Sequence, residues 1–166
     1  MYKEVKKSDP LMQGDIIDNC PVYIVDPDDP ALDSEPKLFE LRVIVITQAC
    51  DLAQDKCNRV VVATVWEAQD LVADGVLKAK TIRDQIRLGK SYGVYFLPAI
   101  NDRVEFPESI VDLRDLNTIP RKILDLLIAE DKRVCSLETP WREHLAQHFG
   151  VTYMRIGLPE PYQTQP

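Results

Sequence analysis

A mostly apolar run from Leu41 to Ile46 is the feature that most constrains the fold of this chain. Its last four residues are all β-branched and no polar residue alternates with them, which predicts a strand over residues 39–46 with both faces buried. A second run of this kind predicts a neighbouring strand over residues 59–66. With 166 residues, the chain can enclose both strands in one core without disulfide bonds. We therefore expect one β-dominated domain over residues 1–166.

The rest of the chain alternates short strand patterns with helical ones. The patterns predict a barrel over residues 12–137 with a helical insertion at 67–88, followed by a C-terminal helix. Residues 1–10 and 159–166 are expected to be loosely held, and residues 120–129 suit either a helix or a strand. The further predicted strands cover residues 14–25, 92–97, 108–113 and 133–137, and the predicted helices cover residues 67–73, 78–88 and 139–156.

Charge and cysteine content exclude several classes of protein. The formal net charge of −7 argues against holding nucleic acid through the overall field, although it leaves room for a small local basic site. No apolar run approaches the ~20 residues that span a bilayer, so we expect no membrane partner. The charged N-terminus lacks a following apolar segment, which favours a cytoplasmic location. The four cysteines, Cys20, Cys50, Cys57 and Cys135, are accordingly expected to be free thiols.

Several motifs occur in the order found in MazF/PemK-type endoribonuclease toxins. Gly14-Asp15-Ile16 is similar to the first strand signature of that family, and the acidic segment 26–36 follows where the family has a long loop. Arg42 to Thr47 resembles the arginine-bearing strand, residues 60–65 the next buried strand, and residues 108–116 the late strand. The resemblance covers residues 12–66 and 92–116. It implies an α+β fold built on an SH3-like, partly open β-barrel, with added helices that include the C-terminal one.

Three further motifs resemble a group of functionally uncharacterised bacterial proteins. That group carries a Thr/Ser-Gln-x-Cys-Asp-Leu turn and ends in an Arg-Glu-His-Leu helix followed by Arg-x-Gly-Leu-Pro. The matching segments are Thr47-Gln48-Ala49-Cys50-Asp51-Leu52, Arg142-Glu143-His144-Leu145 and Arg155-Ile156-Gly157-Leu158-Pro159.

The toxin resemblance implies roles for an arginine and a hydroxyl. The toxins cleave RNA by acid–base chemistry with the strand arginine and a Thr or Ser that ends the following strand, and Arg42 fits the arginine's position. There it would stabilise the charge that develops on the phosphate, whereas the alternative is an arginine paired at a strand start. The hydroxyl position falls on or near Trp66, which cannot do this chemistry. Thr64, two residues earlier, and Thr47 are the remaining candidates.

The polar turn after the first buried strand is a second candidate site, because loops at strand ends often carry chemistry. Cys50 would be a nucleophile if a base lowered its pKa, and Asp51 would orient Arg42 or a histidine. The alternative is a hydrogen-bonded turn with Thr47 and Gln48, in which Asp51 caps the next residues and Cys50 is a small buried filler.

His144 and His148 are the two histidines of the chain and lie four residues apart on the predicted helix, hence on one face. With Cys50 and Cys57 they would make a Cys2His2 metal site, but six residues separate those cysteines, more than such sites use. Simple packing is the favoured interpretation, so we expect neither metal nor cofactor. The sharper alternative is a catalytic pair of His144 and Cys50, with Glu143 or Asp51 orienting the imidazole.

Two segments are candidates for binding a partner. The acidic segment 26–36 contains five acids and no base, which suits a solvated loop or a basic partner. Trp141, Arg142 and Glu143 begin the last helix, and Trp and Arg are frequent at interface hot spots.

The sequence therefore favours a MazF-like accessory or interaction protein of a bacterial toxin–antitoxin or anti-phage defence system. It would act through a protein partner encoded nearby, or as a homodimer, and expose an apolar patch around Trp66 or Trp141. The alternatives are an active endoribonuclease on single-stranded RNA, independent of metal and disfavoured by the net charge, and a thiol- or metal-dependent enzyme using Cys50, Asp51 and His144.

Overall fold

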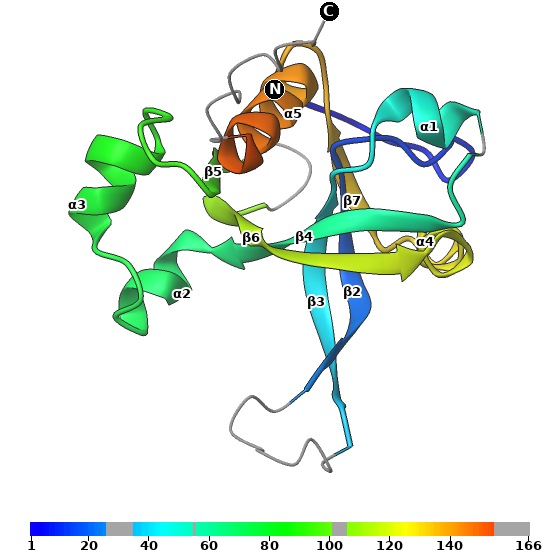
Figure 1. The fold of residues 1–166 in the computed structure, drawn as a ribbon, viewed down its shortest axis with the longest axis horizontal. Helices are drawn as coiled ribbons and strands as arrows, with labels where there is room; N and C mark the ends of the chain where they lie inside the picture. Colours follow the sequence, from blue (N-terminus) through cyan, green and yellow to red (C-terminus); the bar gives the residue numbers. More distant parts are fainter. Residues whose placement is uncertain (26–34, 55, 101–105, 155–166) are drawn as a thin grey trace, which may run out of the picture.

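The computed structural model describes residues 1–25, 35–54, 56–100 and 106–154. They form a strand-rich α+β fold in which seven strands make one curled, half-barrel sheet, in the order β1-β7-β2-β3-β4-β6-β5 (Figure 1). The strand pairings within this sheet are antiparallel. The strands are β1 (Tyr2–Lys3), β2 (Asp15–Ile24), β3 (Lys37–Val45), β4 (Arg59–Glu67), β5 (Val94–Leu97), β6 (Ser109–Pro120) and β7 (Arg133–Leu137).

Helices and helical turns lie around the sheet. They are α1 (Ala49–Ala53), α2 (Ala68–Ala73), α3 (Ala79–Thr81), which continues into the π-helical turn η1 (Ile82–Ile86), α4 (Arg121–Ala129) and α5 (Trp141–Tyr153). The predicted strands are all present, and the ambiguous segment 120–129 is a helix. Leu124 and Ile128 face the core from it, four residues apart as on one helical face.

The core fills both faces of the two central strands. Because side chains alternate along a strand, Ile44 and its partner Ala63 share one face, whereas Val45 and its partner Val62 share the other. Helix α5 covers the first face through Leu145, and helix α4 covers the second through Leu124. The prediction of a strand buried on both faces is thus confirmed for residues 43–46. It is wrong for residues 39 and 40, which are exposed.

The N-terminal residues, which were expected to be loosely held over 1–10, contact the sheet. Strand β1 pairs with β7, and the ammonium of Met1 binds the Glu138 carboxylate at 2.9 Å. The buried guanidinium of Arg133 donates hydrogen bonds to the carbonyl oxygens of Lys6, Asp9 and Pro10. Its other partner is the buried carboxylate of Asp15, at 2.9 Å.

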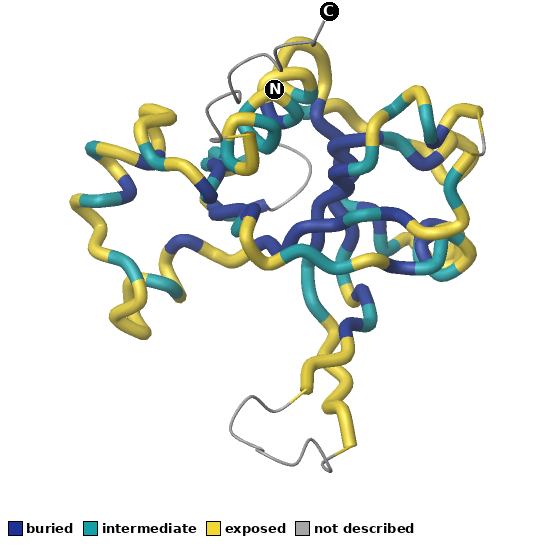
Figure 2. The backbone as a smooth tube through the Cα atoms, viewed as in Figure 1, coloured by how far each residue is buried: buried dark blue, intermediate teal, exposed yellow. Residues whose placement is uncertain are grey.

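A two-stranded arm extends away from the sheet (Figure 1). Strand β2 pairs with β7 only over residues 15–17, and β3 pairs with β4 only over residues 43–45. Beyond those positions the described parts of the two strands pair with each other alone, as far as Ile24 and Lys37. We call residues 20–24 and 37–41 the arm. Residues 23–24 and 37–40 of the arm are exposed to solvent (Figure 2).

The helices differ locally from the sequence expectations. The helix predicted over 78–88 changes to π-helical geometry at Ile82, and the short helix α1 was not expected. The last helix starts at Trp141, two residues after the predicted start, and Pro140 precedes it without a side-chain cap. The segment 26–34, the end of the predicted last helix at 155–156 and the tail 159–166 lie outside the described residues. None of the helices in the described ranges has the length and apolar character to cross a bilayer.

Candidate functional site

Arg42 is enclosed by carboxylates at the root of the arm. Its guanidinium donates two hydrogen bonds to the two carboxylate oxygens of Asp18, and Glu67 Oε1 lies 3.6 Å away. The ring of Phe106 packs against the guanidinium at 5.3 Å. The hydrogen bonds that Arg42 donates to the Asp18 carboxylate raise the pKa of Arg42 above its ordinary value. Asp18 therefore occupies the bidentate position on the guanidinium that a phosphate would use. This agrees with the alternative interpretation of Arg42 as an arginine paired at a strand start.

The candidate hydroxyls do not lie beside Arg42. Val43 and Thr64 are register partners, so their side chains share one face of the sheet, while that of Arg42 belongs to the opposite face. Thr64 is fully buried, and its Oγ1 has no hydrogen-bond partner among the described residues. The Thr47 hydroxyl accepts a hydrogen bond from the Val61 amide at 2.7 Å. Trp66, at the predicted hydroxyl position, is 41% exposed.

The turn from Thr47 to Asp51 leads into helix α1. The carbonyl oxygen of Gln48 accepts hydrogen bonds from the Asp51 and Leu52 amides, which starts the helix. Cys50 is exposed, so the expectation of a small buried filler is wrong. Its sulfur lies 3.6 Å from Gln48 Oε1 and 3.8 Å from Asp51 Oδ1, and both of these are acceptors rather than cations. Asp51 provides no side-chain cap and does not orient Arg42, because Asp18 does.

His144 pairs with a tyrosine instead of a cysteine or a carboxylate. Its Nδ1 lies 3.1 Å from the Tyr95 hydroxyl, and the two rings meet edge to face with centroids 5.5 Å apart. Trp141 contacts the same imidazole from one turn earlier, with centroids 6.4 Å apart. Nothing in the described residues brings Cys50 to His144, so the proposed catalytic pair is absent there. The packing interpretation of this helix face is the one that the contacts support.

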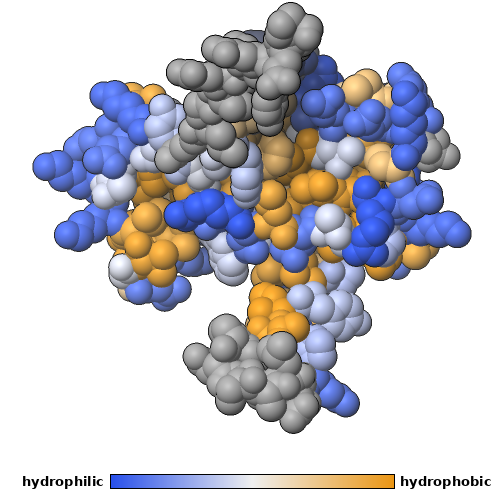
Figure 3. Space-filling model, in the orientation of Figure 1, coloured by the Kyte–Doolittle hydropathy of each residue, from blue (hydrophilic) through white to orange (hydrophobic). Residues whose placement is uncertain are grey.

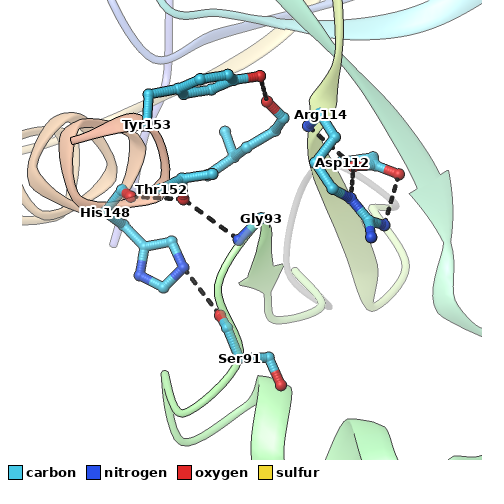
Figure 4. A network of polar contacts seen from close by, with 8 residues as sticks. Ser91, Gly93, Asp112, Arg114, His148, Thr152 and Tyr153 are labelled. Carbon is cyan, nitrogen blue, oxygen red and sulfur yellow. Dashed lines mark hydrogen bonds and ion pairs between the residues drawn. The ribbon is translucent and has the colours of Figure 1, made fainter. Parts of the chain in front are cut away.

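The neighbouring polar residues of α5 anchor the helix or face solvent. His148 Nε2 donates to the Ser91 carbonyl at 3.1 Å, and the Gly93 amide donates to the Thr152 hydroxyl at 3.2 Å (Figure 4). The Tyr153 hydroxyl donates to the Leu113 carbonyl at 2.6 Å. These bonds fix α5 to the segment before β5 and to β6.

The two charged residues after Trp141 contact each other. Arg142 and Glu143 form an ion pair at 2.7 Å, and the Arg142 hydrogen bond lowers the pKa of the Glu143 carboxyl. Glu143 also accepts from the Thr139 hydroxyl at 3.0 Å. The Oε1 atom of Glu143 is thus engaged with Arg142 and Thr139, whereas the imidazole of His144 is oriented by Tyr95.

The metal-site hypothesis finds no support in the geometry. Within the described ranges, no three or more His, Cys, Asp or Glu side chains gather as ligands of a metal ion would. Cys20 and Cys135 are buried, and this burial raises the pKa of Cys20 to about 11 and of Cys135 to about 12. The free state expected for the four thiols is confirmed.

Exposed apolar side chains concentrate on the arm. In the strand register, Tyr23 pairs with Leu38 on one face of the arm. Ile24 pairs with Lys37 on the other face, and Phe39 lies on that second face too. Tyr23 is 68% exposed and Leu38 53%, and Ile24 and Phe39 are each more than two-fifths exposed. Figure 3 shows this hydrophobic surface below the main body. Soluble proteins seldom leave apolar residues clustered in this way unless the surface meets a partner.

Sequence reasoning missed three of these features. Asp18, the partner of Arg42, and Tyr95, the partner of His144, lie on other strands, and neither has a local motif that marks it. Strands were predicted on both sides of the acidic segment, but their pairing with each other beyond the neighbouring strands, which makes the arm, was not.

No protein-family model matches the chain, and no curated protein matches it significantly.

Proposed function

We propose that this protein is a binding module that recognises a protein partner through the arm. The observation that carries the proposal is the concentration of exposed Tyr23, Leu38 and Phe39 on a two-stranded ribbon that projects from the body. The outer edges of the ribbon add main-chain donors and acceptors that are not paired with another described strand. Apolar faces together with open strand edges are what β-strand addition to a partner uses.

The charge near the arm restricts the chemistry of the partner. Residues 26–36 connect its two strands and contain five acids without a base, in a chain of net charge −7. A partner that offers an apolar groove with a basic rim therefore complements the arm, and long-range attraction would speed the encounter. An RNA strand, which is polyanionic, would be repelled by the same charges.

We extend the proposal to an accessory role in a bacterial toxin–antitoxin or anti-phage defence system. This extension is based on the order of motifs that resembles MazF/PemK toxins, with an SH3-like barrel as the proposed finer description of the sheet. Two structural observations favour partner binding over RNA cleavage. The Arg42 guanidinium is occupied by Asp18, and Thr64 lies on the other face of the sheet from Arg42.

The test uses the proteins encoded beside this gene. Each is co-expressed with the full chain, and complexes are measured by calorimetry and by light scattering after size exclusion. We expect one neighbour to bind the wild-type chain, and the double variant Tyr23→Ser, Phe39→Ser to bind it about 100-fold more weakly. Losing two large apolar contacts costs about 3 kcal/mol, which corresponds to that factor.

Leu126→Ser is the matched control, because Leu126 is an apolar residue on α4 with 64% exposure. It should leave the affinity unchanged, and thermal melts should show that all variants fold. Binding that survives the double variant would contradict the proposal. Dimerisation of the pure chain that the double variant abolishes would contradict it too, since the arm would then bind a second copy.

A further inference from the structure

A hollow lies beside helix α5. It has a volume of about 310 Å³ and opens between α5, β5 and the turn after η1, and Tyr95, Trp141, His144, His148, Phe96 and Arg87 are among its lining residues. This volume is at the lower end of the ~300–1,000 Å³ of small-molecule sites. It suits a ligand of one or two rings.

The walls of the hollow are aromatic and closely connected. The Tyr95 ring centroid lies 5.5 Å from that of His144 and 5.7 Å from that of His148, and Trp141 continues the row on α5. Rings at such spacings favour edge-to-face or offset contact with a further planar ring. Trp141 is 40% exposed, so part of its surface is available to a ligand.

Hydrogen bonds fix the orientation of both imidazoles. The Ser91 carbonyl can only accept, so Nε2 of His148 carries the proton that it donates. Burial raises the pKa of Tyr95 to about 12, which keeps its phenol protonated at neutral pH. That proton needs an acceptor, and Nδ1 of His144 at 3.1 Å is the one present among the described residues. With Nδ1 as the acceptor, the His144 imidazole offers Nε2 as a hydrogen-bond donor.

Charge in the hollow is positive although the whole chain is acidic. None of the lining residues named for it is an Asp or Glu, and Arg87 contributes a guanidinium. This guanidinium lies over the Phe96 ring, 5.9 Å from its centroid, and no carboxylate of residues 1–25, 35–54, 56–100 or 106–154 pairs with it. The neighbouring Arg83, by contrast, is paired with Asp84 at 3.1 Å.

The backbone places Arg87 at an unusual point. Its amide donates to the Ile82 carbonyl, five residues earlier, at 2.9 Å, which is the π-helical pattern. Single π-helical turns inside helices are frequent at functional sites, because they redirect side chains that a regular helix would place elsewhere.

We propose that this hollow binds a small aromatic carboxylate. The ring packs among Trp141, Tyr95 and the imidazoles, and the carboxylate pairs with the Arg87 guanidinium in the planar geometry that arginine favours. This site is independent of the arm.

The test is a fluorescence titration of the full chain carrying Trp66→Phe, which leaves Trp141 as the single tryptophan. The probes are benzoate, its neutral amide benzamide, and acetate, each up to about 10 mM, where even weak binding is detectable. We expect benzoate to bind at least about 10-fold more tightly than benzamide or acetate, because only benzoate offers both ring and charge.

Arg87→Met should abolish the preference for benzoate over benzamide, whereas Arg83→Met, the matched control, should preserve it. Both side chains are exposed, so neither change disturbs the core. Amide NMR shifts on benzoate addition should centre on β5 and α5. Equal binding of benzoate and benzamide, no binding at all, or an affinity that Arg87→Met leaves unchanged would overturn the proposal.

Discussion

Replacing Arg133 by Met should be among the most destabilising single changes in this protein. The side chain of Arg133 is 3% exposed and that of Asp15 is 1% exposed, so the ion pair between them has little contact with water. Met matches the length of the apolar stem but offers no donor. It leaves the Asp15 carboxylate buried with one remaining hydrogen bond, from the Met12 amide at 2.9 Å.

Removing one partner of a buried ion pair costs about 3–5 kcal/mol, and three backbone carbonyls between Lys6 and Pro10 lose the hydrogen bonds that Arg133 donates. We expect the urea midpoint to fall accordingly and hydrogen exchange to become faster over residues 4–12. The exposed Arg114, which pairs with Asp112, is the control, since Arg114→Met should cost less than about 1 kcal/mol. A loss below about 1 kcal/mol for Arg133→Met would refute this reasoning.

Three further predictions concern the cysteines, Arg42 and Tyr95. In native protein at neutral pH, a thiol reagent should modify Cys50 first and Cys57 more slowly, whereas Cys20 and Cys135 should react only after unfolding, and Cys50→Ser should remove the fast phase. Arg42→Met should lower stability by about 1–2 kcal/mol in urea titrations, and neither this variant nor the wild type should cleave single-stranded RNA. If the wild type cleaves the RNA and the variant does not, the ribonuclease hypothesis is restored. Since the pKa of Tyr95 is raised to about 12, its contribution to stability should be complete below about pH 10 and lost as the pH rises toward 12. Phenolate absorbance of the wild type minus that of Tyr95→Phe should show this late titration.

Strands were the most predictable part of the fold. The stretches 43–46 and 60–65 are rich in β-branched residues, which predicts central strands, and their burial on both faces follows from the lack of alternation. The end of the burial could not be predicted, because Phe39 is as apolar as the buried residues 43–46. Its exposure results from the point at which β4 stops pairing with β3, which depends on the whole sheet.

The candidate site was predictable only where the partners are close in sequence. The hydrogen bonds around Cys50 involve Gln48 and Asp51, within two residues of it. The partner of Arg42 lies 24 positions away and that of His144 lies 49 positions away, across strand pairings that no local pattern encodes. A π-helical turn is likewise hidden in the sequence, since Ile82 and Ile86 keep an ordinary helical spacing.

Hydrogen–deuterium exchange of the complex tests the central claim most directly. The backbone amides over residues 20–24 and 37–41 are compared in the free chain and with the bound neighbour-encoded protein, with helix α4 as the internal reference. Recognition through the arm predicts that binding slows exchange at these amides and leaves α4 unchanged. Slowed exchange elsewhere on the protein, with the arm unaffected, would contradict the account.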